Sequence, residues 1–257
     1  MLKRLAVGLV VIIIVLGIIF IILDILDIQE DYRLSLPMDI LNLILIFIIA
    51  IAVAYMSIVV FRITSLPEVI YLGIAALVFG ISSLFRGWVD VSGNLVLNIE
   101  SITVLGASFL HFLGVNVAMA RNHILNTTQK QTLFLVITLY FVLFTVVILV
   151  VVFAFRGVTM PYTVPGEGAT MFRGIFRIIA IIFTISSAII TYKLYKKLHT
   201  SFYYWYSLGL ILFAVGICFI PLGGIETRIS WVGRFSVYLC GIYFLLSIRS
   251  INRDVKI

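Results

Sequence analysis

Arginine residues able to bind an anion recur near the ends of the apolar stretches of this sequence. Arg173 and Arg177 are four residues apart, so on a helix they project from one face, one turn from each other. Arg86 and Arg234 occupy comparable positions in two other apolar stretches. The planar guanidinium group of arginine binds carboxylate or phosphate through two parallel hydrogen bonds. These residues predict a pocket for a small anionic ligand if their side chains converge.

A further apolar stretch contributes polar residues to the same predicted pocket. Glu100 begins it, and His111 follows eleven residues later, about 16 Å deeper along a helix. Because arginine stays charged, His111 is the group at this depth that can change charge near neutral pH. Two alternatives stay open. His111 could be a hydrogen-bonded core residue, and the arginines could pair with Asp90, Glu100, Glu167 and Glu226 at the helix ends.

The composition places these residues in a membrane protein. Of the 257 residues, 63% are hydrophobic and 11% are charged, and the mean hydropathy is +1.25, values that exclude a soluble domain. In hydrocarbon every backbone amide must be hydrogen-bonded within the protein, which permits helices or a closed barrel. The apolar stretches reach about twenty residues without alternation, the length of a helix that crosses the membrane. We therefore expect an all-α, polytopic transmembrane helix bundle.

Apolar runs between charged residues and Pro, Gly or Asn predict eight spans. They cover residues 5–26, 38–61, 67–85, 100–120, 131–155, 170–192, 203–221 and 231–248. The first run is too long for a signal peptide and lacks a cleavage site, so residues 1–30 are expected to form an uncleaved anchor helix and the start of an outer loop. Residues 31–257 would then form a seven-helix bundle with a short cytoplasmic tail.

The distribution of charge predicts the orientation, because cytoplasmic loops retain Lys and Arg. With both termini in the cytoplasm, the inner side carries eleven basic residues, every lysine among them, against Glu68 and Asp254. The outer side carries seven arginines and nine acidic residues. Membrane orientation thus explains the net charge of +7. We expect membrane lipids, and not nucleic acid, as partners.

The residues that several kinds of membrane-protein chemistry require are absent from this sequence. No lysine lies inside a predicted span to hold retinal, and His111 is the single histidine at bilayer depth, where a cytochrome b needs pairs. The motifs H-E-x-x-H and G-x-S-x-G are absent, and Cys218 and Cys240 show no metal spacing. We therefore expect no enzymatic activity, no cofactor and no metal.

The last two predicted spans resemble a known family. They contain WYSLGL at 205–210 and SWVGRFSVYLCGIY at 230–243. This pattern resembles the final helices of the membrane-embedded, seven-helix sensor regions of histidine kinases and diguanylate cyclases. The resemblance covers mainly residues 201–251 and rests on four residues: Trp231, Gly233, Arg234 and Tyr238.

The resemblance implies that residues 38–248 form a sensory bundle, and Arg234 and Tyr238 are included in the expected ligand site. Such sensor regions usually continue into a cytoplasmic PAS, kinase or cyclase domain. This chain stops at Ile257, so a signal would pass to a separate signalling protein or to the subunits of a complex.

Three classes of function compete. A sensory, receptor-like module would bind a small anionic or lipid ligand at an outward-facing site and signal through helix packing. The residues of that site are Arg86, Glu100, His111, Arg173, Arg177, Arg234 and Tyr238. A transporter or channel is disfavoured because all five prolines lie at span ends or in loops. A non-catalytic structural subunit would use the small face of Gly73, Ala76 and Gly80 to pack on a partner, although this face could equally serve contacts within the bundle.

Overall fold

The computed structural model describes residues 2–25, 40–88, 93–124, 163–164, 168–169, 171–222 and 227–254. Its helices are α1 (Leu2–Ile25), η1 (Leu43–Ile48), α3 (Ile49–Thr64), α4 (Pro67–Trp88), α5 (Gly93–Ile124), α7 (Met171–Leu198), α8 (Ser201–Phe219) and α9 (Arg228–Asp254). A two-residue antiparallel pair joins β1 (Thr163–Val164) to β2 (Gly168–Ala169). The predicted helical class is therefore confirmed for the described residues, apart from this short pair.

Six of the described helical segments are long and apolar enough to cross a membrane. They are Leu5–Ile22, Ile40–Thr64, Ile99–Ala120, Arg173–Leu198, Ser201–Phe219 and Arg228–Ile251, and Pro67–Ser83 is a shorter apolar helix. Helices of this number, length and composition are those expected of a multi-pass membrane protein. The predicted span 131–155 lies outside the described residues, so the count of eight spans stays a prediction.

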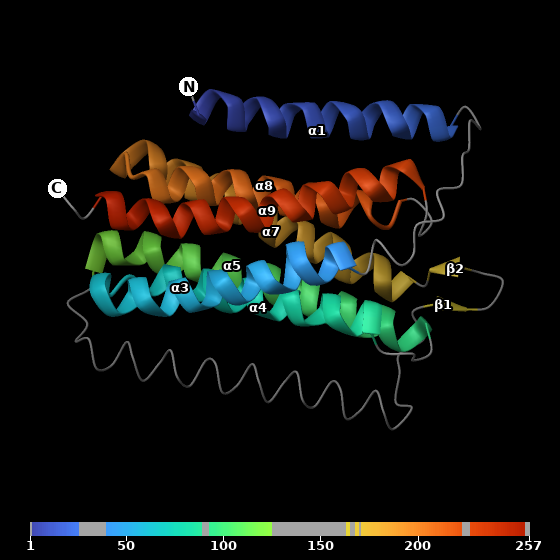
Figure 1. The fold of residues 1–257 in the computed structure, drawn as a ribbon, viewed down its shortest axis with the longest axis horizontal. Helices are drawn as coiled ribbons and strands as arrows, with labels where there is room; N and C mark the ends of the chain where they lie inside the picture. The colour runs from blue at the N-terminus through green and yellow to red at the C-terminus, as the bar shows by residue number, and fades with distance from the viewer. Residues whose placement is uncertain are drawn as a thin grey trace.

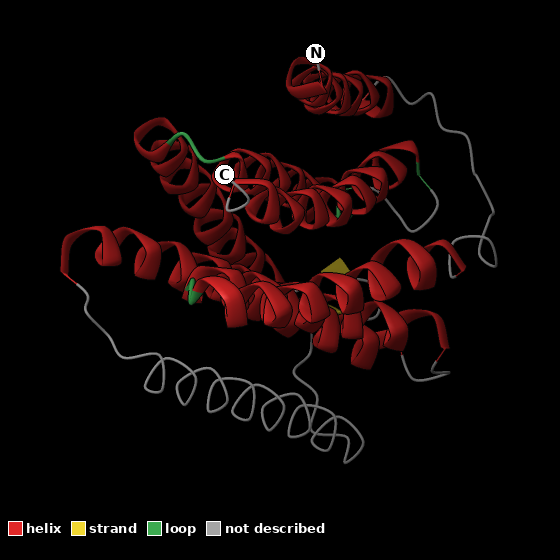
Figure 2. Cartoon of the chain, turned by 60° about the vertical axis from the view of Figure 1, so that its left-hand side comes forward, coloured by secondary structure: helices red, strands yellow, loops and turns green. Residues whose placement is uncertain are grey.

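Six of the described helices, α3, α4, α5, α7, α8 and α9, contact one another in a closed series, and all of them run along the length of the bundle (Figure 1). Consecutive helices pack antiparallel, α3 on α4, α4 on α5, α7 on α8 and α8 on α9, while α5 packs on α7 and α3 on α9. Helix α1 lies at the periphery, where it contacts α8 and α9 (Figure 2). The start of α1 and the end of α9 lie at the same end of the bundle. The side of the membrane that this end faces, and the division into an anchor and a seven-helix bundle, stay predictions.

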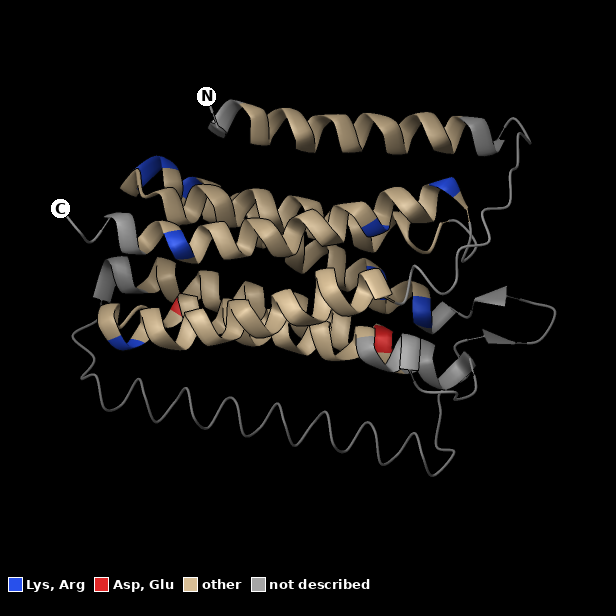
Figure 3. Ribbon diagram, viewed as in Figure 1, with Lys and Arg blue, Asp and Glu red and all other residues tan. Residues whose placement is uncertain are grey.

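In the part of the chain that the structure describes, charged residues gather toward the two ends of the bundle and leave its middle uncharged (Figure 3). We call one end the lysine end, because it holds the C-terminal turns of α3, α7 and α9 with Arg62, Lys193, Lys196, Lys197 and Arg249. The other is the arginine end, where α7 and α9 begin with Arg173, Arg177, Arg228 and Arg234. This separation is the one that the charge pattern of the sequence predicts for a membrane-spanning bundle.

Small residues bring α3 and α4 together. A Cβ atom on Gly73 would lie 2.6 Å from the Ser57 Cβ, and one on Gly80 would lie 2.5 Å from the Ala50 Cβ. Ala76, between the two glycines, is also buried. The small face of α4 therefore serves close helix packing inside the bundle, which was one of the two interpretations of its sequence.

Helix α7 shows how the bundle faces lipid. Its outer face carries Ile178, Ile182, Ile185 and Ile189, which are between 45% and 59% exposed. Its inner face carries Thr184, Ser187 and Thr191, each fully buried. The Thr184 hydroxyl lies 3.0 Å from the Ser108 hydroxyl of α5. Apolar side chains face outward and small hydroxyl groups face inward, the arrangement expected of a helix whose outer solvent is hydrocarbon.

Candidate ligand site

A cavity of about 60 Å³ lies at the arginine end of the bundle. We call it the polar cavity. Its lining residues are Asn42, Ile46, Phe79, Ser82, Ser83, Glu100, Ser101, Val104, Arg177, Phe213, Gly216, Ile217, Ile220, Pro221, Arg234 and Val237. A single water needs about 10–15 Å³, so the polar cavity has room for a small ligand. Three of the predicted site residues, Glu100, Arg177 and Arg234, meet in its wall.

These three residues meet because they lie at similar depths on neighbouring helices. Arg177 and Arg234 each follow the first residue of their helix by six positions, and Glu100 follows the start of α5 by seven. At about 1.5 Å per residue, each residue lies about 9–10 Å from the start of its helix. Since α5 packs on α7 and α9 packs on α4 beside α5, equal depth places the three charged groups in one layer.

Glycines allow Arg234 to enter the bundle. A Cβ atom on Gly233 would lie 2.7 Å from the Ile220 backbone nitrogen, and one on Gly216 would lie 2.4 Å from Val237 Cγ2. The start of α9 therefore lies directly against the end of α8. Arg234, next to Gly233, is only 2% exposed. A permanent charge buried to this extent in a membrane protein is costly unless its surroundings compensate it, and such residues mark functional sites.

Arg173 and Arg86 differ from the other predicted residues. Arg173 is half-buried and lies two residues after the start of α7, one turn closer to the N-terminus of the helix than Arg177. It is not among the described residues that line the polar cavity. Arg86 belongs to α4, and its side chain lies outside the described part of the structure.

Tyr238 supports the wall of the polar cavity. Its hydroxyl donates a hydrogen bond to Asn42 Oδ1 at 2.9 Å, and both residues are buried. Asn42 lines the cavity immediately before η1, a π-helical turn within the segment Ile40–Thr64. Single π-helical turns inside longer helices are frequent at functional sites. Sequence reasoning missed Asn42, because a single asparagine at the start of an apolar run resembles an ordinary boundary residue.

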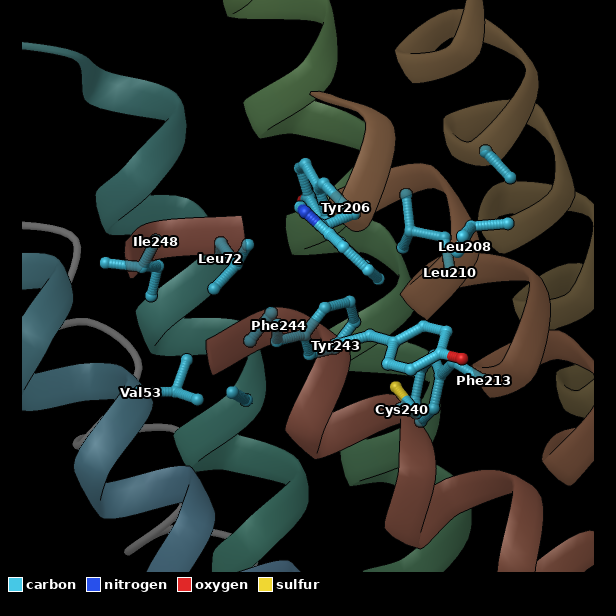
Figure 4. Packing of buried hydrophobic residues seen from close by; sticks show 14 of the residues in the cluster. Val53, Leu72, Tyr206, Leu208, Leu210, Phe213, Cys240, Tyr243, Phe244 and Ile248 are labelled. Atoms are coloured by element: carbon cyan, nitrogen blue, oxygen red, sulfur yellow. The ribbon is translucent and has the colours of Figure 1, made fainter. Parts of the chain in front are cut away.

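His111 lies deeper, as its position in the sequence predicts. Its Nδ1 is 2.9 Å from the Tyr206 hydroxyl, and its ring centroid lies 5.9 Å from that of Phe213 and 5.0 Å from that of Phe244. Figure 4 shows Tyr206 and Phe213 of α8 and Phe244 of α9 in the same cluster of buried residues. Buried hydrogen bonding of this kind favours the interpretation of His111 as a core residue.

His111 also lines a second cavity of about 30 Å³, which we call the apolar cavity. Its other lining residues are Leu45, Ile46, Ile49, Ala50, Val53, Ala75, Ala76, Phe79, Phe213, Val237, Cys240, Gly241 and Phe244. Ile46, Phe79, Phe213 and Val237 line both cavities. The apolar cavity therefore adjoins the polar cavity on the side of the bundle interior.

A buried acid at the lysine end also escaped sequence reasoning. Glu68 is fully buried, and its Oε1 accepts a hydrogen bond of 2.9 Å from the Tyr203 hydroxyl. The sequence predicts Glu68 at the inner end of the span 67–85, and the structure places it in the first turn of α4, after Pro67, with its side chain buried. The helix dipole stabilises a carboxylate there. Its position one residue after a helix-starting proline was the available signal.

Comparison with known proteins gives no indication of the function of this chain. Neither a family model, nor a curated protein, nor a solved structure matches the chain. The resemblance to kinase and cyclase sensor regions and the expectation that the chain is no enzyme therefore stay predictions. Among the described residues, no group of three or more His, Cys, Asp or Glu side chains is placed to hold a metal ion.

Proposed function

We propose that this chain is a receptor-like membrane module that binds a small anion in the polar cavity and signals through helix packing to a separate partner protein. The observation that carries the proposal is the meeting of Arg177, Arg234 and Glu100 in one cavity wall. They come from α7, α9 and α5. An anion bound to both arginines would connect α7 and α9, which are distant in the sequence.

The charges of the polar cavity favour an anion with one negative charge. Among the described residues that line the cavity, two guanidinium groups and one carboxylate give an excess of one positive charge. A monoanion would neutralise this excess, and in a low-dielectric site such an interaction is stronger than in water. Ser82, Ser83 and Ser101 add hydroxyl groups that can donate hydrogen bonds to the same ligand.

Helix α9 offers a route from the ligand to a cytoplasmic partner. It carries Arg234 near its start and continues over 27 residues to the lysine end. A bound anion changes helix packing only if it binds one of two packing states more tightly than the other. Contacts with three helices supply such a difference whenever the distance between α7 and α9 differs between the states.

The proposal is tested by ligand titration of the full chain in nanodiscs of zwitterionic lipid, with sodium acetate and inorganic phosphate as probes. We expect Arg177→Gln and Arg234→Gln each to weaken anion binding about tenfold to a hundredfold, the effect of losing a charge-assisted hydrogen bond. Arg173→Gln is the matched control, because it makes the same change one turn away, outside the cavity lining. Unchanged binding in the Arg177→Gln, Arg234→Gln double variant would refute the proposal.

A further inference from the structure

The two cavities differ sharply in chemistry although they share a wall. The polar cavity contains Arg177, Arg234 and Glu100, whereas the lining of the apolar cavity is hydrocarbon apart from His111 and Cys240. His111 already uses one ring nitrogen in its bond to Tyr206. An apolar cavity of this kind does not hold ordered water and accepts apolar groups. A ligand that occupies both cavities must therefore be charged at one end and apolar along the rest.

One face of α9 extends along both cavities. Arg234 and Val237 line the polar cavity, and Val237, Cys240, Gly241 and Phe244 line the apolar cavity. These positions recur at helical spacing on a single face. From Arg234 to Phe244 is ten residues, or about 15 Å along the helix. The two cavities thus follow one another along α9, from the arginine end toward the centre of the bundle.

Small side chains border the apolar cavity. Ala50, Ala75, Ala76 and Gly241 all line it. A Cβ atom on Gly241 would lie 3.0 Å from Ile49 Cγ2. Larger side chains at these positions would occupy the apolar space, and a single leucine there would fill much of it.

We infer that the ligand is an amphiphilic monoanion, a carboxylate or phosphate group that carries an unbranched alkyl chain. The anionic group lies between Arg177 and Arg234, and the chain extends along α9 into the apolar cavity toward His111. This inference rests on the proposed function, because it assigns a tail to the anion bound in the polar cavity. In this inference the apolar cavity binds the alkyl chain, and the charged residues of the polar cavity bind the anionic group.

The test compares sodium acetate, hexanoate and decanoate by calorimetric titration of the full chain in zwitterionic nanodiscs, with empty nanodiscs subtracted to remove partition into lipid. We expect affinity to increase about fourfold for each buried methylene until the apolar cavity is filled. Equal affinity for the three carboxylates would overturn the inference. Acetate binding that Arg234→Gln abolishes would still support the proposed function, so the two failures are distinguishable.

A variant of the apolar cavity gives the decisive control. Ala76→Leu places a larger side chain in the apolar cavity and leaves the lining of the polar cavity unchanged. We expect it to remove the gain from hexanoate to decanoate and to leave acetate affinity within about twofold. Ala76→Val, a smaller change, replaces it if the leucine variant does not fold. An unchanged dependence on chain length in a folded variant would overturn the inference.

A second arm identifies the source of the alkyl chain. Increasing fractions of phosphatidylglycerol in the nanodisc are titrated against decanoate. Competition indicates that an anionic membrane lipid occupies the site, and absence of competition indicates a free alkyl carboxylate. Either result, combined with the chain-length dependence, supports an amphiphilic monoanion.

Discussion

The bond between Tyr203 and Glu68 allows a quantitative test of the structure. The Tyr203 hydroxyl lies 2.9 Å from Glu68 Oε1, Glu68 is fully buried and Tyr203 is 4% exposed. Tyr203→Phe removes the donor and leaves the carboxyl group in place. Hydrogen bonds inside membrane proteins contribute on average about 0.6 and at most about 1.7 kcal/mol. Because this acceptor is a buried carboxyl group, we expect a loss near the upper limit, about 1.5 kcal/mol.

The assay is reversible unfolding of the full chain in mixed micelles, followed by circular dichroism. Tyr55→Phe is the matched control, because it makes the same change on an exposed side chain of α3, and we expect it to alter the free energy of unfolding by less than about 0.5 kcal/mol. A double-mutant cycle with Glu68→Gln isolates the pairwise energy. If Tyr203→Phe and Tyr55→Phe cost the same, and the cycle shows no coupling, the hydrogen bond that joins α8 to α4 through Tyr203 and Glu68 is absent.

Three further predictions concern the site. Gly233→Ala brings a Cβ atom against the Ile220 backbone; we expect it to destabilise the fold by about 1–3 kcal/mol in thermal unfolding and to weaken acetate binding, because Arg234 moves with α9. Tyr238→Phe removes the hydrogen bond to Asn42, and calorimetry should show anion affinity reduced about fivefold or less while the fold is retained. His111→Phe leaves the hydroxyl of its tyrosine partner without that bond and should cost about 1–3 kcal/mol in unfolding, whereas an increase in stability would contradict the buried contact.

The sequence predicts the positions of the helices well because a hydrophobic run marks the residues that lie in the hydrocarbon core. The structure, however, extends α5, α7 and α9 beyond their predicted spans, to Gly93–Ile124, Met171–Leu198 and Arg228–Asp254. An apolar run ends where the hydrocarbon ends, whereas the hydrogen-bonded backbone of a helix continues into the polar interface. Composition therefore locates the crossing and underestimates the length of the helix.

The candidate site could be predicted in part. Position along a helix gives depth, and this was sufficient to bring Glu100, Arg177 and Arg234 together. The rule that residues four apart share a helical face did not place Arg173 in the cavity wall. The rule predicts the direction of a side chain and not its depth in the membrane. Pairings between distant segments carry no local signal. The partner of Glu68 is 135 residues away, and that of His111 is 95 residues away.

The apolar outer face and hydroxyl-bearing inner face of α7 indicate that its packing can persist when detergent replaces the bilayer. The isoleucines of its outer face are solvated by acyl chains, so they contribute little to the attachment of the helix to its neighbours. Threonine and serine hydroxyls and tight van der Waals contact supply that attachment. In detergent, the isoleucines of the outer face contact detergent alkyl chains in place of lipid acyl chains. The contacts of the inner face stay inaccessible to water. Polar residues introduced on the outer face of α7 would make the helix more soluble in water. They would leave its contacts with the neighbouring helices unchanged.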